Sequence, residues 1–249
     1  EAVMNISIDF KDASGSGISG ANIVCGLGRG RSLHIFGDLF YHRTSDSVRI
    51  LDAGNTAYLR SLFTSQGIVS IVPHLEGQYL GILIDARDRT VRFFSDRYAR
   101  QDYFYAQNES RFYISDSLDF IFQHVEPRYD QRMLAHLFSV YGWYTPKGAT
   151  IYSNVRRLKV GELLTVSSQG VASEILPFKP LAVREYGQDA LEAYFHALRD
   201  STSCRANRKG VNWVSSSSGW DSSMVLGMLV DLCGAKHVGM VTGSMKYSG

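Results

Sequence analysis

A serine-rich segment near the end of the chain holds the residues whose types and spacing best suit chemistry. It lies between the apolar runs 211–214 and 224–230 and reads Ser215-Ser216-Ser217-Ser218-Gly219-Trp220-Asp221-Ser222-Ser223. This order predicts a short strand, a turn of small residues and a helix. The N–H groups and the dipole at the start of such a helix favour a bound phosphate. Asp221 could hold a Mg²⁺ ion beside that phosphate.

The segment lacks the Gly-Lys-Ser/Thr ending of a Walker A loop. It resembles the pyrophosphate-binding loop of ATP pyrophosphatases, usually Ser-Gly-Gly-x-Asp-Ser, with Ser218 at the first glycine. The resemblance implies Asp221 as the Mg²⁺ ligand and adenine contact near Thr242. It implies phosphate contacts from Ser217, Ser218, Gly219, Ser222 and Ser223. The alternative is a serine-rich connection to a capped helix.

The composition limits the classes of protein to consider. A chain of 249 residues suggests one large or two modest domains, and a hydrophobic content of 45% favours a packed core over disorder. Lys and Arg total 26 against 24 Asp and Glu, without a basic run, so we expect no nucleic-acid partner. No apolar run reaches membrane-spanning length, and the N-terminus does not read as a signal peptide, so we expect no membrane partner.

Cysteines and histidines indicate no metal centre. Cys25, Cys204 and Cys233 are far apart and form no CxxC motif, which argues against a disulfide framework and a zinc site. This cysteine usage suggests a reducing cytoplasm. The histidines, among them His34 and His42, lack metal-ligand spacing, so we expect solvated or structural roles.

The first part of the chain is rich in short strand patterns. We expect strands at 4–10 and 32–36, and hairpins that pair 81–85 with 91–94, 102–106 with 111–115, and 161–166 with 172–175. Helical spacing occurs at 56–63, 118–122 and 131–141. The glycines of 26–31 suggest a hairpin turn rather than an anion-binding loop.

The composition changes at Pro177-Phe178-Lys179-Pro180, where two prolines disfavour regular structure, so we place a domain boundary there. Beyond it we expect a helix at 188–202 and a second strand at 237–242. Arg205, Arg208 and Lys209 could reach a phosphate, but the alternative is a solvated helix end. One strand–helix–strand unit is too little for an independent parallel sheet, so we expect this domain to be truncated.

Several segments, in order, resemble asparagine synthetase and its relatives. The segment Gly77-Gln78-Tyr79-Leu80-Gly81-Ile82-Leu83-Ile84-Asp85 is similar to the family's Gly-x-Phe-Ala-Phe-Ala-Leu-Trp-Asp. Segments 95–105, 113–118, 150–152, 157–158 and 161–162 follow the family's order. The resemblance implies an α+β, Ntn-hydrolase-like glutamine amidotransferase domain over 4–176, with antiparallel sheets and flanking helices. It implies the start of an α/β parallel-sheet ATP-pyrophosphatase domain over 185–249.

The same comparison predicts that the glutaminase site is inactive. The family begins Met-Cys-Gly-Ile, whereas this chain reads Met4-Asn5-Ile6-Ser7, and Asn5 is no nucleophile. Phe36-Gly37-Asp38 replaces Asn-Gly-Glu, which removes a side-chain oxyanion donor. Ala53-Gly54-Asn55-Thr56-Ala57 replaces the segment that binds the glutamine ammonium, and no Arg-Gly-Pro-Asp clamp is found. We interpret Cys25 as a small buried hydrophobe, not a substitute nucleophile.

We therefore expect an amide-forming ligase that uses ATP and Mg²⁺ and acts through an acyl-adenylate. Its partner would be a small carboxylate substrate, with ammonia or a substrate amine as nitrogen donor; the second option resembles β-lactam synthetases and lasso-peptide cyclases. A homodimer is an open expectation. The alternatives are a non-catalytic binding or scaffold protein that keeps both folds and, more distantly, an active amidotransferase.

Overall fold

The computed structural model describes residues 4–243 except 14–17, 45–46, 53, 143, 177–184 and 218. The chain divides into two compact units, Glu1–Lys179 (unit 1) and Pro180–Gly249 (unit 2). The boundary segment 177–180 lies outside the described residues. Among the described helices, none is long and apolar enough to cross a membrane.

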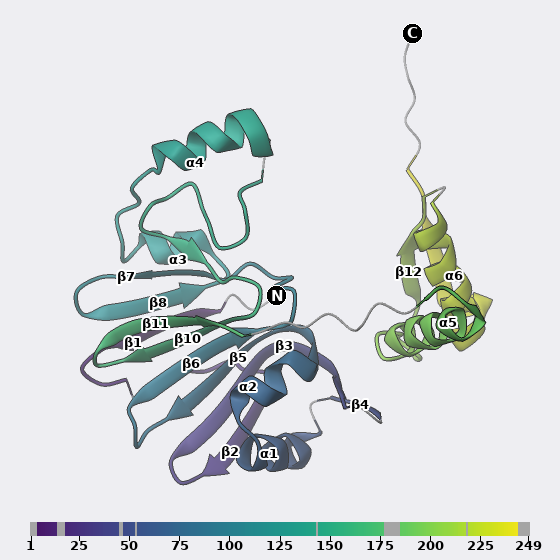
Figure 1. Cartoon of the computed structure of the whole chain (residues 1–249), viewed down its shortest axis with the longest axis horizontal. Helices are drawn as coiled ribbons and strands as arrows, with labels where there is room; N and C mark the ends of the chain where they lie inside the picture. The colour runs from purple at the N-terminus through teal and green to yellow at the C-terminus, as the bar shows by residue number, and fades with distance from the viewer. Residues whose placement is uncertain are drawn as a thin grey trace. The chain divides into compact units, whose positions relative to one another are not determined.

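Unit 1 contains two antiparallel sheets (Figure 1). The smaller sheet has the order β1-β8-β7-β9, with bounds Asn5–Asp9, Arg111–Ser115, Phe104–Gln107 and Arg156–Arg157. The larger has the order β11-β10-β6-β5-β3-β2, with bounds Gly170–Ile175, Glu162–Ser167, Thr90–Ser95, Leu75–Asp85, Arg31–Arg43 and Ile23–Gly28; β4 (Val48–Ile50) pairs with β3.

Helices cover the outer face of each sheet, so unit 1 has four layers (Figure 1). Helices α1 (Thr56–Ser65) and α2 (Ile68–Ile71), followed by the short η1 (Val72–His74), cover the larger sheet, and α3 (Leu118–Phe122) covers the smaller one. Helix α4 (Gln131–His136) continues into the π-helix η2 (Leu137–Tyr141). This helix–sheet–sheet–helix order confirms the expected α+β, Ntn-hydrolase-like fold with antiparallel sheets.

Strand β5 shows why the two sheets stack. Successive side chains of a strand point to opposite faces. Tyr79 and Leu83 therefore pack beneath α1 and α2, whereas Leu80 and Ile82 pack between the sheets against β1 and Phe93. All four are buried, so β5 has no solvent-facing side over this stretch. This burial explains why its sequence is almost continuously apolar rather than alternating.

Unit 2 consists of one strand–helix–strand unit and a preceding helix. Helix α5 (Gln188–Ser203) is followed by β12 (Asn212–Ser215), α6 (Trp220–Cys233), η3 (Ala235–His237) and β13 (Val238–Val241). Strands β12 and β13 pair in parallel, as a strand–helix–strand connection requires. Arg199 of α5 forms an ion pair of 2.7 Å with Asp231 of α6.

The structure confirms the three predicted hairpins, β5–β6, β7–β8 and β10–β11, and the expected helices. The glycine-rich 26–31 segment forms the β2–β3 hairpin, with positive φ at Gly28, Arg29 and Gly30. Strand β3, however, is much longer than the predicted 32–36, and β2 and β4 were not predicted. Gly37 and polar residues after it interrupt the apolar pattern, but the long partner strand β5 continues the pairing to His42.

His42 is buried on β3, and its Nδ1 lies 2.7 Å from the Tyr58 hydroxyl of α1. Burial lowers the pKa of His42 below its ordinary 6.5, and the charge of His74 lowers it further. The unfolded chain then binds the proton more readily, so the free energy of unfolding should fall as the pH drops from about 7 to 5. His42→Asn should flatten this part of the curve in urea denaturation. An unchanged slope would contradict the assignment.

Candidate functional site

A pocket of about 870 Å³ opens in unit 1 where the resemblance places the glutaminase site; we call it the first pocket. It lies among the start of β1, the middle of β3 and β5, and the loops that follow β6 and β8. Its lining residues are Met4, Gly20, Asn22, Phe36, Gly37, Asp38, Gln78, Gln101, Asp102, Tyr103, Asp116 and Ser117. The structure therefore brings together the 36–38, 95–105 and 113–118 segments.

Neither Asn5, which stands where the resemblance places the nucleophile, nor the preceding Met4 has a nucleophilic side chain. Met4, only 6% exposed, lines the first pocket, and its N–H donates to Asp116 Oδ1 at 3.1 Å. Asn5 is exposed, does not line the pocket, and accepts a 2.8 Å hydrogen bond from the Ser115 hydroxyl. Neither a thioether nor an amide can attack a glutamine carbonyl as a thiolate does.

The backbone N–H of Gly37, which lies in the first pocket, is already bonded within the protein. The N–H of Gly37 donates to Asn22 Oδ1 at 2.7 Å. Phe36, which stands where the family has an asparagine side chain, is buried in the core between the sheets. Electrostatic stabilisation of a tetrahedral intermediate needs donors aimed at the developing charge. In this pocket the Gly37 N–H is already bonded to Asn22, and the Phe36 ring, which replaces the asparagine side chain, cannot donate a hydrogen bond.

Cys25 does not supply a replacement nucleophile. It is 1% exposed on β2, packs in the core beneath α1, and its thiol donates to the Thr56 carbonyl. Burial raises the pKa of Cys25, only partly offset by the charge of Arg60, so the reactive thiolate is disfavoured. None of the three cysteines forms a disulfide.

Asn55 lies apart from the first pocket, at the start of α1. Its side-chain amide donates to Asp52 Oδ1 at 2.5 Å. It is not among the lining residues, and Ala53 lies outside the described part of the chain. The structure therefore does not place this segment where it could bind a glutamine ammonium.

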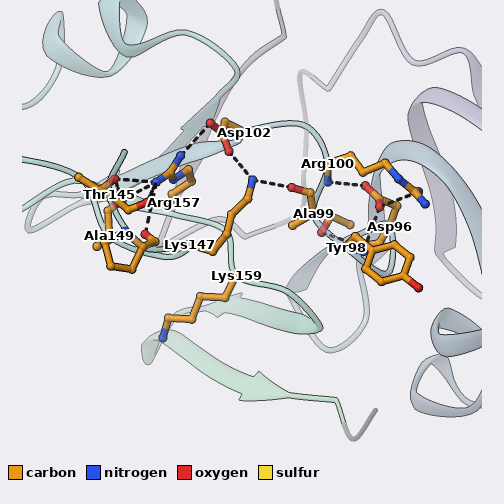
Figure 2. Close-up of polar contacts among 12 residues, drawn as sticks. Asp96, Tyr98, Ala99, Arg100, Asp102, Thr145, Lys147, Ala149, Arg157 and Lys159 are labelled. Atoms are coloured by element: carbon orange, nitrogen blue, oxygen red, sulfur yellow. Dashed lines mark hydrogen bonds and ion pairs between the residues drawn. The ribbon is translucent and has the colours of Figure 1, made fainter. Parts of the chain in front are cut away.

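A network of cations holds the loop that forms one wall of the first pocket (Figure 2). Asp102 forms two ion pairs. Its Oδ1 lies 2.7 Å from Lys147 Nζ, and its Oδ2 lies 2.9 Å from Arg157 Nη1. Lys147 also donates to the Ala99 carbonyl, and Arg157 Nη2 donates to Thr145 Oγ1 at 2.7 Å. Burial alone would raise the pKa of Asp102, but these hydrogen bonds and charges outweigh it and lower the pKa. Asp102 thus stays ionised with its charge already balanced.

Asp96 anchors the other end of the same loop (Figure 2). It is fully buried and accepts from the N–H groups of Tyr98 and Arg100, while the Arg100 guanidinium bridges Asp96 at 3.2 Å and Glu76 at 2.6 Å. Burial raises the pKa of Asp96 despite these bonds, with a further contribution from Glu76. The loop 96–102 is therefore fixed at both ends, and it presents Gln101 and Tyr103 to the pocket as a hydrogen-bonded pair.

The second candidate site is the serine-rich loop of unit 2, between the carboxyl end of β12 and the start of α6. The Ser217 N–H donates to Ser222 Oγ at 3.1 Å, and the Gly219 N–H donates to Ser217 Oγ at 3.1 Å. Ser223 Oγ donates to the Gly219 carbonyl at 3.0 Å. The structure thus brings Ser217, Gly219, Ser222 and Ser223 together, while Ser218 lies outside the described residues.

Asp221 and Thr242 flank this loop. Asp221 lies exposed in the first turn of α6, whose leading N–H groups have no acceptor within the helix. Thr242 follows β13, and the Ser216 N–H donates to the Val241 carbonyl at 2.9 Å, which ties the two strand ends together. Among the described residues, no group of three His, Cys, Asp or Glu side chains could hold a metal ion.

The basic residues after α5 do not point to a phosphate. Arg205 Nη1 donates to the Ser201 carbonyl at 2.8 Å, and Arg208 donates to the Ser203 hydroxyl at 3.1 Å. Both acceptors belong to α5. These contacts support the helix-end interpretation, since cations there offset the negative end of the helix dipole.

Asn22 and Arg157 are site residues that the sequence reasoning did not assign. Asn22 becomes identifiable only once the β2–β3 register is known, because Ile23 pairs with Ile35 and Asn22 then lies beside Phe36 and Gly37. Arg157 and Asp102 lie 55 residues apart in the sequence, and no local sequence pattern predicts their contact.

Comparisons with known proteins complete the description of the site. A family profile described as a glutamine amidotransferase domain matches residues 38–178, more than half of the chain. A solved structure of the allosteric regulatory enzyme of purine biosynthesis is 12% identical, covers 97% of this chain and has a TM-score of 0.40. Glutamine phosphoribosylpyrophosphate amidotransferase from B. subtilis, complexed with ADP and GMP, is 9% identical over 89%, with a TM-score of 0.38. This chain covers 51% and 48% of those chains, respectively, about half their length. No curated protein sequence matches it.

Proposed function

Because the chain belongs to the glutamine amidotransferase domain family, we propose that unit 1 is an amidotransferase-like domain without glutaminase activity and that the whole protein is an ATP-dependent amide-forming ligase. Unit 2 would supply the start of the nucleotide site. The nitrogen would come from free ammonia or from an amine of the substrate rather than from glutamine.

The first pocket supports the loss of glutaminase activity. Met4, just before β1, lines it in place of a nucleophile, the Gly37 N–H is bonded to Asn22, and Asp102, one of the carboxylates in its lining, is neutralised by two cations. Covalent amide hydrolysis needs a nucleophile, an oxyanion donor and a means of holding the substrate. The first two requirements are unmet by the pocket's described residues.

The parallel β12–α6–β13 unit is the observation that carries the ligase proposal. In parallel α/β structures, ligands bind at the carboxyl ends of the strands, and here that edge holds the serine-rich loop, tied to β13 through Ser216. The leading N–H groups of α6, which have no acceptor within the helix, suit a pyrophosphate group. In the proposed reaction a substrate carboxylate oxygen attacks the α-phosphorus of ATP and pyrophosphate leaves. An amine nitrogen then attacks the acyl carbon, loses a proton and displaces AMP.

The residues present fit a Mg²⁺ ion held together with a nucleotide. Mg²⁺ is commonly bound by one or two carboxylates together with substrate phosphates and waters. Asp221, which is exposed at the start of α6, would supply one carboxylate. The ion would offset phosphate charge as pyrophosphate departs.

The proposal predicts that Asp221→Ala weakens Mg·ATP binding by at least about tenfold, because one ligand contact to the ion is lost. Asp189→Ala is the matched control, since Asp189 is an acidic residue in the first turn of α5. Equilibrium binding of a fluorescent ATP analogue with Mg²⁺ measures both variants. Equal losses, or no binding by the parent protein, would contradict the nucleotide site.

The same preparation, made from the longest native form of the protein, should release AMP and pyrophosphate from Mg·ATP with ammonia and a carboxylate such as aspartate. It should release no glutamate from glutamine. Glutamate release would overturn our interpretation of Met4, Asn5 and Gly37. ATP binding without AMP release across a panel of carboxylates would favour the scaffold alternative.

A further inference from the structure

A second pocket of about 450 Å³ lies at the opposite edge of unit 1, between β7 and β9 of the smaller sheet and β10 and β11 of the larger one. It shares no lining residue with the first pocket. Its size falls within the range of small-molecule sites. The half-buried Val171 forms its apolar part, backed by the buried Ala106 and Leu164, and Ser153 and Asn154 add polar groups.

A fixed phenol lies on the polar side of this second pocket. Tyr105 is 8% exposed, and its hydroxyl forms hydrogen bonds with Glu162 and Arg156. Burial, with the charge of Glu162, raises the pKa of Tyr105 to about 12, so the hydroxyl keeps its proton at neutral pH. The Glu162 side chain is itself fully buried and accepts from the Ser173 hydroxyl at 2.5 Å and the Lys159 N–H at 2.8 Å. Glu162 is thus satisfied within the protein and holds Tyr105 in place.

Arg156 supplies the only formal charge among the residues that line the second pocket. It lies exposed on β9 and is held by its hydrogen bond with the Tyr105 hydroxyl. A guanidinium beside a partly apolar cavity presents a planar fork of donors that matches a carboxylate.

We propose that the second pocket binds a small monocarboxylate with a compact apolar body. Its carboxylate would lie on Arg156, and its apolar part would pack on the half-buried Val171. A phosphate dianion is disfavoured because the described lining offers it a single guanidinium, which can balance only one of its two charges. The neutral hydroxyl and amide groups of the rim can orient a ligand but add no positive charge.

Three probes of similar shape test this assignment: benzoate, the neutral benzamide and the dianionic phenyl phosphate. For a ligand of benzoate's size we expect a dissociation constant of about 1 mM. Two-dimensional amide NMR on the whole chain should show benzoate shifting the signals of Gln107, Ser153 and Ser173, with binding at least tenfold weaker for benzamide and for phenyl phosphate.

Arg156→Gln should weaken benzoate binding at least tenfold and leave benzamide binding unchanged. Arg132→Gln, at an exposed arginine of α4 outside the pocket, is the matched control and should bind benzoate like the parent. Val171→Phe, which fills the apolar part, should weaken benzoate binding without removing the charge. Equal benzoate affinity in Arg156→Gln and the parent, equal affinity for benzamide, or tighter binding of phenyl phosphate would each overturn the proposal.

Discussion

Gly37→Ala should destabilise unit 1 by about 3–5 kcal/mol, the sum expected for backbone strain and steric overlap in a packed core. Gly37 has φ +95°, a region that L side chains rarely adopt, and an added Cβ would lie 2.2 Å from the Gln78 carbonyl oxygen of β5. Because that neighbour is backbone in the middle of the larger sheet, it cannot rotate away. The whole β3–β5 pairing would have to shift.

Urea denaturation followed by far-ultraviolet circular dichroism measures this loss. Gly26→Ala is the matched control, because Gly26 lies on the neighbouring strand β2, has open space around an added Cβ and no positive φ. That change should alter the free energy of unfolding by less than about 1 kcal/mol and in the stabilising direction. Equal denaturation midpoints for the two variants would contradict the close approach of β3 and β5 at the first pocket.

Arg157→Ala should cost about 3 kcal/mol of unfolding free energy, because removing a largely buried guanidinium leaves several of its hydrogen-bond acceptors unsatisfied at once. The Arg157 side chain is 14% exposed and bonds Asp102, Thr145 and the Ala149 carbonyl. All of these would lose a charged donor at once. Arg157→Lys should recover only part of the loss, since an ammonium cannot reproduce the fork.

Lys147→Ala is the control for Arg157, because Lys147 contacts the same carboxylate but is 41% exposed. An exposed ion pair contributes little, so this variant should lose less than about 1 kcal/mol. Thermal unfolding of the three variants ranks them. A larger loss for Lys147→Ala than for Arg157→Ala would show that the buried side of the network does not stabilise the loop.

Local pattern predicted most elements of this chain but not how they meet. The hairpins and helices follow from alternation, helical spacing and turn residues, all of which act over a few neighbours. The β3 extension and β4 depend on pairing with distant residues, as Tyr41 does with Glu76, and such pairing leaves no trace in a short window. The sequence could therefore predict the two-sheet class of unit 1 without the strand order.

Some features of the candidate site follow from residue type alone, whereas others depend on strand register. The absence of a nucleophilic cysteine next to Met4 is visible in the sequence, because it concerns the type of one residue. That Met4 rather than Asn5 faces the first pocket depends on the β1–β8 register, in which Asn5 pairs with Ser115. The bond from Gly37 to Asn22 depends likewise on a hairpin register. Burial and register, not residue type, decide which groups remain available to a ligand.

The strand order of the larger sheet has a consequence for synthesis on the ribosome. Strand β6 pairs on one side with β10, so that Phe94 lies opposite Leu163, and that partner is translated about seventy residues later. Until then the apolar edge of β6 has no partner, and an unpaired edge of this kind invites association with other chains. Strand β1 stays unpaired over a longer stretch of synthesis, because its partner β8 pairs Ser115 with Asn5. The nascent domain therefore carries an unpaired, association-prone strand edge until residue 167, the end of β10, has left the exit tunnel.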